Sequence, residues 1–451
     1  MSTLMVSISG IRGIVGDGLD PNIIVNFTSA YADFTGKGKV IVGRDARVTG
    51  DMVNRIVTAT LNAKGIDVID IGICPTPTVQ YTVKTLNARG GIAISASHNP
   101  NEWNALKLLN STGQFMTPEE NTELLEILNL SQNKYKTWDE IGKTTFYAEG
   151  IKKHMHDVLE MKYIDKEAIR KRKFKVLADC VNGAGVYVIP ELLRELGCEV
   201  IEYNCEKTGI FPRLPEPIPE NLTETMKEVK KNKADFGVVV DPDVDRLVLI
   251  TDTGEAFGEE NTITQAVKFI LSKEKGNAVV NLSTTRGVDD VAKDEGCKVF
   301  RSPVGEANVV KKMKEINAVI GGEGSGGVIY PALHYGRDAL AGIAITLQHL
   351  LESGLTMNEL RKSLPSYFIT KKKIMTGENN PDAIISLLAE KYKAEKINID
   401  DGLRIDFPDH WVHFRKSNTE PIIRIITEAK DKDASQSLSD KYVEVIKKLA
   451  Q

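Results

Sequence analysis

Three stretches of the chain repeat one pattern, in which the end of an expected helix is followed by a glycine and then by an alternating strand. The stretches are LNAKGIDVIDIG at 61–72, LRELGCEVIEYN at 193–204 and AKDEGCKVFRSP at 292–303. Gly65, Gly197 and Gly296 stand where the residue after a helix needs a positive φ. Because an apolar strand and a turn precede each stretch, each is half of a strand–helix–strand unit. The sequence therefore predicts three similar α/β domains, with helices covering mixed or mostly parallel sheets.

The last part of the chain departs from this pattern. After residue 366 we expect a short helix, strands around GLRIDF and EPIIRIITEA, and a final helix, which together predict a smaller α+β domain. At roughly 150 residues per domain, the 451 residues are compatible with two to four domains. The expected domains are 1–150, 151–250, 251–366 and 367–451.

Charge and cysteine content exclude several classes of protein. Charged residues make up 27% of the chain and the formal net charge is −4, so the basic field that favours nucleic-acid binding is absent. The five cysteines are scattered without a C-x-x-C pair, which argues against a disulfide framework or a zinc site. The stretch MSTLMVSISGIRG lacks a charged region followed by a long apolar segment, and no apolar run of about 18 residues occurs in the sequence. We expect a cytoplasmic protein without nucleic-acid or membrane partners.

The stretch ISASHNP at 94–100 ends an apolar run in Ser97 and His98. The apolar residues predict a buried strand, and α/β proteins bind ligands where such strands end. A hydrolase triad is not favoured, because neighbouring side chains of an extended chain point to opposite faces and no G-x-S-x-G elbow surrounds Ser97. By itself, the stretch is explained slightly better as a turn begun by Asn99-Pro100.

A second loop, within DFGVVVDPDVDRL at 235–247, places three aspartates at alternate positions after an apolar strand. They are Asp241, Asp243 and Asp245, with Arg246 beside them. Burying three like charges is costly unless a cation neutralises them, and oxygen ligands at this spacing suit Mg²⁺. An EF-hand is excluded, because Arg246 stands where its loop needs glycine and Asp252 where it needs glutamate. A solvated acidic turn is the alternative.

A third loop, IGGEGSGGVIY at 320–330, matches the dinucleotide motif G-x-G-x-x-G without its context. A strand and Pro331 follow instead of a helix, and Glu323 would repel a pyrophosphate. Glu323 and Ser325 suit sugar hydroxyls better, because a carboxylate accepts hydrogen bonds from two hydroxyls at once.

A fourth loop, RKSNTEPIIR at 415–424, combines cations with short polar side chains. Its candidate ligands are Arg415, Lys416, Ser417, Asn418, Thr419 and Arg424. This combination predicts a phosphate-binding loop, with a plain polar turn as the alternative. A Walker A motif at IGKTT is excluded, because Thr137 stands where its first glycine should be.

Together the four loops offer a hydroxyl nucleophile, a divalent-cation site, a hydroxyl-binding loop and a phosphate-binding loop. This inventory indicates phosphoryl transfer on a sugar phosphate.

The same four loops give the chain its resemblance to a known family. With SASHNP, DPDVDR, GEGSGG and RKSNTEP in that order, the chain resembles the α-D-phosphohexomutase superfamily over essentially its whole length. The resemblance implies a heart-shaped enzyme of four domains around a central cleft. It also implies that Ser97 is phosphorylated and that a phosphate oxygen on Ser97 joins Asp241, Asp243 and Asp245 as a ligand of one Mg²⁺.

The resemblance further assigns roles around the phosphoserine. It implies that Arg12, Arg246 and Lys107 gather around the phosphate. His98 and Lys107 match positions near the reacting oxygen, and Lys107 is the better general acid–base candidate, which requires a depressed pKa.

The implied reaction is a two-step relay. Phospho-Ser97 gives its group to a hexose monophosphate, a 1,6-bisphosphate turns over, and the other phosphate returns to Ser97. Arg415, Ser417, Asn418 and Thr419 would hold the phosphate that is not reacting. A hexose 1,6-bisphosphate is the expected activator, and the enzyme is expected to be a monomer or homodimer.

The choice of sugar rests on the third loop. Its GEGSGG form resembles the branch assigned as phosphoglucosamine mutases, which implies interconversion of glucosamine 6-phosphate and glucosamine 1-phosphate. Mannose or glucose phosphates are the alternative substrates, and a sugar-phosphate phosphatase is the alternative from another class. Many relatives have histidine where this chain has Gly327, and His334 is a speculative substitute.

Overall fold

The computed structural model describes residues 2–7, 10–130, 134–377, 379–416 and 422–449. Contacts divide the chain into two compact units. The first unit is Met1–Thr262 with Gly326–Arg361, and the second is Ile263–Ser325 with Lys362–Gln451. Within the described ranges, no helix combines the length and apolar character needed to cross a membrane.

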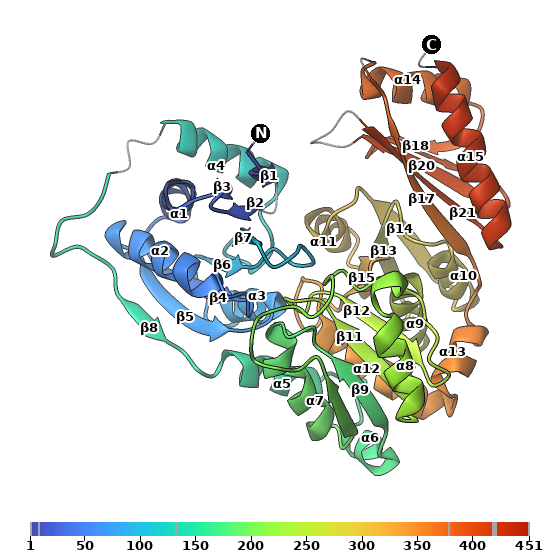
Figure 1. Ribbon diagram of the computed structural model, residues 1–451, viewed down its shortest axis with the longest axis horizontal. Helices are drawn as coiled ribbons and strands as arrows, with labels where there is room; N and C mark the ends of the chain where they lie inside the picture. The colour runs from blue at the N-terminus through green and yellow to red at the C-terminus, as the bar shows by residue number, and fades with distance from the viewer. Residues whose placement is uncertain (1, 8–9, 131–133, 378, 417–421, 450–451) are drawn as a thin grey trace. The chain divides into compact units, whose positions relative to one another are not determined.

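The N-terminal part of the first unit is built on an eight-stranded sheet of order β1-β2-β7-β6-β4-β5-β8, with β3 paired to β2 (Figure 1). The strands are β1 (Met5–Ser7), β2 (Gly10–Val15), β3 (Gly18–Leu19), β4 (Lys39–Arg44), β5 (Asp67–Ile73), β6 (Gly90–Ile94), β7 (Trp103–Leu109) and β8 (Thr144–Phe146). The helices are α1 (Pro21–Thr35), α2 (Gly50–Ala63), α3 (Thr76–Thr85) and α4 (Pro118–Leu130).

Helices cover both faces of this sheet because side chains of a strand alternate between faces. Val40 and Val42 of β4 share a core with α1, α2 and α4. Gly43 points to the other face, where an added Cβ would lie 2.8 Å from Val79 of α3. Strand β4 is parallel to β5 and β6, whereas β7 is antiparallel to β6. The sheet is therefore mixed.

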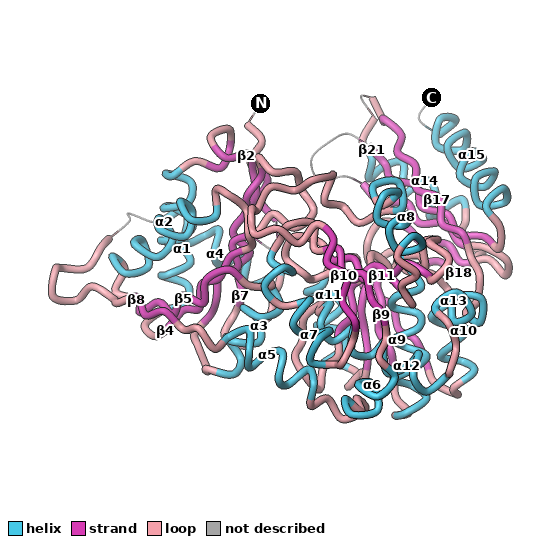
Figure 2. The backbone as a smooth tube through the Cα atoms, turned by 60° about the horizontal axis from the view of Figure 1, so that its bottom comes forward, coloured by secondary structure: helices cyan, strands magenta, loops and turns pink. Residues whose placement is uncertain are grey.

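Two further sheets repeat the α/β plan, and Figure 2 shows β9, β10 and β11 of one of them as neighbouring magenta strands. One has the order β10-β9-β11-β12, and the other has the order β14-β13-β15-β16. Their strands are β9 (Lys175–Asp179), β10 (Glu199–Tyr203), β11 (Phe236–Val240), β12 (Leu247–Thr251), β13 (Asn277–Asn281), β14 (Lys298–Ser302), β15 (Ile320–Glu323) and β16 (Gly327–Ile329). In each, two parallel strands flank a central strand.

Helices connect and cover these strands. They are α5 (Gly150–Leu159), α6 (Lys166–Arg172), α7 (Ile189–Glu195), α8 (Thr223–Lys231), α9 (Glu259–Lys273), α10 (Gly287–Asp294), α11 (Glu306–Glu315), α12 (Ala339–Ser353) and α13 (Met357–Ser363), with 3₁₀ helices η1 (Ala184–Tyr187) and η2 (Pro219–Asn221).

The C-terminal part of the second unit is an antiparallel sheet of order β17-β21-β20-β19-β18 with two helices. Its elements are β17 (Phe368–Met375), α14 (Pro381–Lys391), β18 (Lys396–Asn398), β19 (Leu403–Asp406), β20 (Trp411–Lys416), β21 (Ile422–Ala429) and α15 (Lys432–Leu449). Ile384 of α14 and Tyr442 of α15 pack into one core with β19, β20 and β21.

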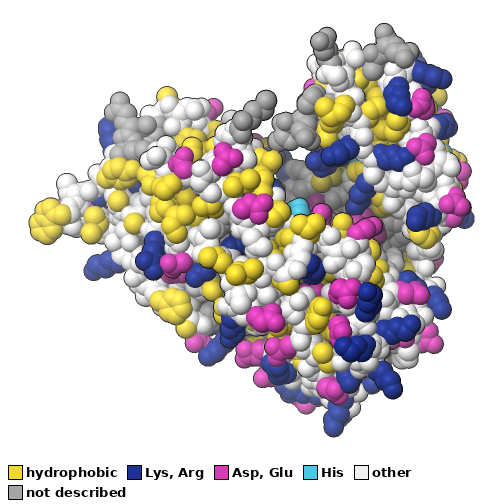
Figure 3. Space-filling view, in the orientation of Figure 1, with side chains coloured by type: hydrophobic (Ala, Val, Ile, Leu, Met, Phe, Trp, Pro, Cys, Tyr) yellow, Lys and Arg dark blue, Asp and Glu magenta, His cyan; other side chains and the backbone are white. Residues whose placement is uncertain are grey.

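The structure confirms the expected fold class, with three α/β sheets and a smaller α+β part. Gly65, Gly197 and Gly296 have φ values of 79°, 74° and 69°, as a residue after a helix requires. Figure 3 shows acidic and basic side chains intermixed on the face that it draws, without an extended patch of one sign among its described residues.

Candidate active site

Ser97 lies three residues beyond β6 in a left-handed backbone conformation, with φ of 49°. Its N–H donates to Ser95 Oγ at 2.9 Å, and Ser95 Oγ donates to Asp45 Oδ2 at 2.7 Å. The expectation that Ser97 and His98 point to opposite faces was wrong, because the chain is not extended here. Ser97 Oγ and His98 Nδ1 are 3.4 Å apart. Ser97 is also largely buried, with 7% of its surface exposed.

Arg47 stabilises this loop through hydrogen bonds to its backbone, a role that we did not predict. Its Nη2 donates to the carbonyl oxygens of Ser97 and Asn99, both at 2.7 Å, and its Nε pairs with Asp45 at 3.0 Å. The stretch GRDAR, which contains both Asp45 and Arg47, is the sequence feature that could have indicated this network. A guanidinium can satisfy several carbonyls at once, which a buried loop requires.

The three aspartates lie at the end of β11 and are completely or almost completely buried. Ser97 Oγ donates to Asp241 Oδ2 at 2.7 Å, so the serine and the acidic loop meet as we expected. One oxygen from each aspartate lies within 4.8 Å of the others. Burial and the charges of Asp245 and Asp243 raise the pKa of Asp241 well above its usual range.

Basic side chains surround this acidic cluster. Lys107 of β7 places Nζ 2.6 Å from Asp243 Oδ2 and 3.3 Å from Asp245 Oδ2. Arg337, which sequence reasoning missed, places Nη2 2.7 Å from Asp245 Oδ2. Burial alone would lower the pKa of Lys107, but Asp243 and Asp245 raise it above the ordinary value. The depressed pKa expected for a lysine acid–base group is therefore not found.

The donor set fits a divalent cation. Among the residues that the structure describes, Asp243 Oδ1 and Asp245 Oδ1 are buried without a hydrogen-bond partner. Such orphaned anionic oxygens are costly unless something binds them. Carboxylate oxygens with a serine oxygen nearby are the hard ligands that Mg²⁺ prefers.

His98 and Arg12 flank the serine. Burial, with the nearby charge of Arg246, lowers the pKa of His98 to about 3, so its ring is neutral near pH 7. Arg12 Nη1 donates to Asn99 Oδ1 at 3.3 Å. Burial and Arg246 lower the pKa of Arg12. Arg246 donates its backbone N–H to Asp241 Oδ1 at 3.2 Å.

In the second unit, Glu323 ends β15 and is 5% exposed. Its Oε1 accepts from Asn281 Nδ2 at 2.8 Å and from Gly305 N–H at 2.9 Å, which fixes the carboxylate. Neither Asn281 nor Gly305 was predicted. Ser325 follows in the loop and is partly exposed.

The expected phosphate-binding loop is described in part. Arg415 of β20 and Arg424 of β21 are directly opposite each other in the ladder, and Arg415 Nε lies 2.9 Å from Asp401 Oδ2. Cross-strand partners share a face, so the two cations stand together. Ser417, Asn418 and Thr419 lie outside the described residues.

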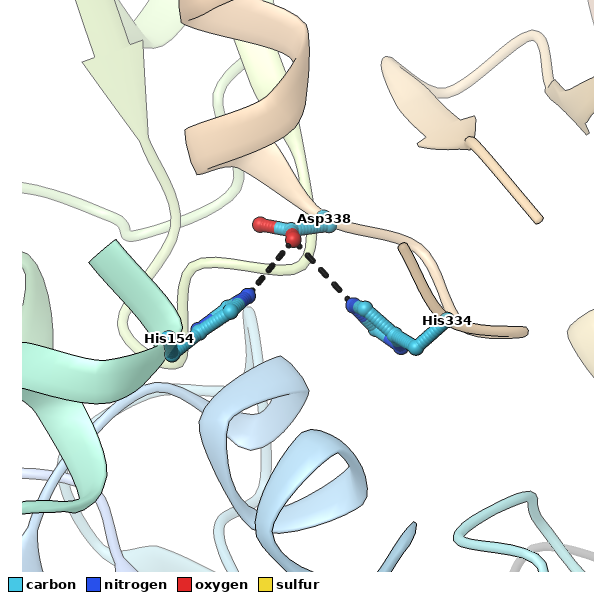
Figure 4. A group of neighbouring side chains, drawn as sticks. All are labelled: His154, His334 and Asp338. Carbon is cyan, nitrogen blue, oxygen red and sulfur yellow. Dashed lines mark hydrogen bonds and ion pairs between the residues drawn. The ribbon is translucent and has the colours of Figure 1, made fainter. Parts of the chain in front are cut away.

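A second buried cluster joins His154 of α5, His334 and Asp338 (Figure 4). Both Nε2 atoms lie close to Asp338 Oδ2, at 2.9 Å from His154 and 3.1 Å from His334. Because a carboxylate oxygen only accepts, each Nε2 carries the proton. Asp338 Oδ1 also accepts from Leu340 N–H and caps α12. The hydrogen bonds explain this cluster without a metal.

His334 is unsuited to replace the histidine expected at Gly327, because it is only 3% exposed and bonded to Asp338.

We expect this cluster to make the stability of the fold depend on pH. Burial lowers the pKa of His334, while Asp338 opposes the shift and His154 and Lys84 support it. A pKa below the unfolded value of about 6.5 means that the unfolded chain binds the proton more strongly, so stability falls as pH falls below that value. We expect His334→Gln to reduce the drop in melting temperature between about pH 7.5 and about pH 5.5, measured by calorimetry.

The control for this prediction is His156→Gln, which changes an exposed histidine on the same helix as His154. It should keep the wild-type dependence of melting temperature on pH. An unchanged dependence in His334→Gln would show that His334 does not titrate differently in the two states.

Comparisons with known proteins agree over the whole chain. The phosphoglucomutase/phosphomannomutase family matches through its alpha/beta/alpha domain I at residues 5–134, domain II at 152–254, domain III at 260–368 and C-terminal domain at 372–445. A "Probable phosphoglucosamine mutase" from Methanopyrus kandleri is 34% identical over 98% of this chain and 97% of its own length. A "Phosphoglucomutase/phosphomannomutase" from Thermococcus kodakarensis is 39% identical, with 95% of each chain covered.

Solved structures share the fold. A phosphoglucomutase/phosphomannomutase family protein from Burkholderia thailandensis has a TM-score of 0.86 at 24% identity, covering 99% of this chain and 98% of its own. The N-acetylphosphoglucosamine mutase of Aspergillus fumigatus, in complex with GlcNAc-6P and magnesium, has a TM-score of 0.60 at 13% identity, covering 99% and 96%. With all four family domains matched in order, the chain belongs to the phosphoglucomutase/phosphomannomutase family, the phosphohexomutases, which are isomerases that transfer phosphate intramolecularly.

Proposed function

We propose that this enzyme is a phosphoglucosamine mutase, which interconverts glucosamine 6-phosphate and glucosamine 1-phosphate through a phosphorylated Ser97. The observation that carries the proposal is the contact of Ser97 Oγ with Asp241 Oδ2 at 2.7 Å, beside two carboxylate oxygens without partners. A nucleophile on a cation site is the arrangement that phosphoryl transfer needs.

Ser97, Asp241, Asp243 and Asp245 would hold one Mg²⁺ per chain. When bound, the ion supplies positive charge that stabilises the transferring phosphoryl group. The Aspergillus fumigatus mutase, whose structure is a complex with GlcNAc-6P and magnesium, supports this choice of cation.

In the forward half-reaction, the P–O bond to Ser97 breaks as a bond forms between phosphorus and the free hydroxyl oxygen of the hexose phosphate. The hydroxyl gives up its proton and the serine oxygen regains one, so the step balances. Lys107, which its raised pKa keeps charged and able to act as an acid, and His98 are the residues proposed to move this proton, with Arg12 and Arg246 stabilising the phosphate charge. The second half-reaction reverses these roles at the other end of the 1,6-bisphosphate, and a hexose 1,6-bisphosphate would prime the enzyme.

The second unit would recognise the rest of the substrate. Glu323, fixed by Asn281 and Gly305, and Ser325 would bind sugar hydroxyls. Arg415 and Arg424, with Ser417, Asn418 and Thr419, would bind the phosphate that is not reacting. We propose the domain limits 1–150, 151–250, 251–366 and 367–451 for these four contributions, in a monomer or homodimer.

A phosphomannomutase/phosphoglucomutase is the second candidate. The relative with that name is 39% identical to this chain, compared with 34% for the relative named as a phosphoglucosamine mutase.

The test is a ³¹P NMR time course with Mg²⁺ and a trace of glucose 1,6-bisphosphate, in which glucosamine, mannose and glucose 6-phosphates are offered separately. We expect the glucosamine ester to be converted to its 1-phosphate fastest. Faster conversion of the mannose or glucose ester would establish the second candidate. Release of inorganic phosphate alone would contradict both and indicate a phosphatase.

A further inference from the structure

Arg337 forms an ion pair with Asp245, one of the proposed metal ligands. Its Nη2 lies 2.7 Å from Asp245 Oδ2, and the two side chains are 11% and 1% exposed. Lys107 Nζ lies 2.6 Å from Oδ2 of Asp243. Among the described residues, Oδ1 of both carboxylates has no hydrogen-bond partner, although Arg246 Nε forms a longer ion pair with Asp245 Oδ1 at 3.9 Å.

Gly327 makes the position of Arg337 possible. A Cβ added at Gly327 would lie 2.3 Å from Arg337 Cδ and 2.9 Å from Arg337 Cγ, and these are its nearest neighbours. Gly327 is not among the residues with positive φ, so its backbone would accept a side chain. The side chain of Arg337 therefore occupies the space that a larger residue at position 327 would need.

The segment that carries both residues is attached to the aspartate loop at two points. Leu247 N–H donates to the carbonyl oxygen of Gly326 at 2.9 Å, and Ala339 N–H donates to that of Val244 at 3.2 Å. Val244 has a φ of 64°, which a β-branched residue adopts only when its surroundings impose it. These two hydrogen bonds fix the positions of Gly327 and Arg337 relative to the aspartate loop.

We infer that Arg337 is a positioning residue for the metal site: its side chain packs against Gly327, binds Oδ2 of Asp245, and so holds this carboxylate in the orientation in which it would bind the cation. The inference rests on the proposed metal site. Hydrogen-bond partners of metal-ligating carboxylates orient them, and their loss typically weakens metal binding by about 10–100-fold. In this chain, glycine at 327 and arginine at 337 form a matched pair, where the family resemblance leads one to expect a histidine at 327.

The test is a double-mutant cycle read by Mn²⁺ binding, with Mn²⁺ as the probe in place of Mg²⁺. Free Mn²⁺ is measured by electron paramagnetic resonance during titration of the full-length wild type, Arg337→Ala, Gly327→Ala and the double variant. We expect each single variant to weaken Mn²⁺ binding by about tenfold or more. The double variant should bind no more weakly than either single variant, because both changes remove the same contact.

Two matched controls exist in the same unit. Gly150→Ala adds a Cβ whose nearest neighbour is at 3.5 Å, an ordinary contact, and Arg361→Ala removes an arginine that pairs with the exposed Glu255. Both should bind Mn²⁺ like the wild type, and circular dichroism should confirm that all variants fold.

Additive losses, unchanged binding in Gly327→Ala, or tighter binding in Arg337→Ala would overturn the inference. Tighter binding would mean that the charge of Arg337 merely repels the ion. If the wild type itself binds no Mn²⁺, the proposed metal site fails, and the inference fails with it.

Discussion

Replacing Ser97 by alanine is expected to reduce mutase turnover by roughly 10⁴-fold or more, because loss of the nucleophile removes the covalent route. The fold should survive, since the hydroxyl makes few contacts beyond Asp241 Oδ2 and His98 Nδ1. Turnover is measured by ³¹P NMR with glucosamine 6-phosphate and a trace of glucose 1,6-bisphosphate. Intact-protein mass spectrometry should show a phosphate on the wild type after incubation with the bisphosphate and none on Ser97→Ala.

The matched control is Ser111→Ala, which changes an exposed serine of the same domain. It should keep wild-type turnover and phosphorylation. Substantial turnover in Ser97→Ala would place the phosphoryl group on another residue.

Asp241→Asn is expected to lower turnover and to raise stability at once. The change removes a charged metal ligand, and since metal ions contribute several kcal/mol to transition-state stabilisation, turnover should fall by about 10³-fold. Burial, Asp245 and Asp243 raise the pKa of Asp241, so its charge at neutral pH costs stability in the metal-free protein. In EDTA, the melting temperature of Asp241→Asn should therefore exceed that of the wild type by about 2 °C or more.

This second prediction is checked by thermal melts with EDTA and with excess Mg²⁺. Mg²⁺ should stabilise the wild type and have a smaller effect on Asp241→Asn. The exposed Asp139→Asn serves as the control and should follow the wild type in both buffers. A lower melting temperature of Asp241→Asn in EDTA would show that the buried carboxylate is needed for folding rather than for the metal.

The parts of the site that sequence reasoning found are those that chemistry restricts to few residue types. The aspartates after β11 and the serine after β6 stood out because strand ends in α/β sheets carry ligands. Ser97 and Asp241 are 144 residues apart, and the family resemblance carried by the four motifs was what implied that they meet.

The parts that were missed depend on backbone geometry and on contacts between distant segments. The left-handed Ser97 cannot be deduced from its identity, because serine rarely adopts that conformation. Arg337 lies 92 residues from Asp245 in the sequence. It can reach that carboxylate because Gly327 has no side chain in the space that the arginine side chain occupies. The raised pKa of Lys107 likewise follows from which carboxylates lie within reach.

The division of the chain into units also fixes when the first unit can be completed during synthesis. Its core includes α12, whose residues 339–350 are buried, and Asp165 N–H bonds to Gln348 Oε1 across 183 residues. Residues 263–325 of the other unit are translated in between. At roughly 5–20 residues per second, the ribosome therefore exposes an incomplete apolar surface for several seconds before residue 361 emerges. Shortened chains that end before that residue should aggregate, even though they contain Ser97 and all three aspartates.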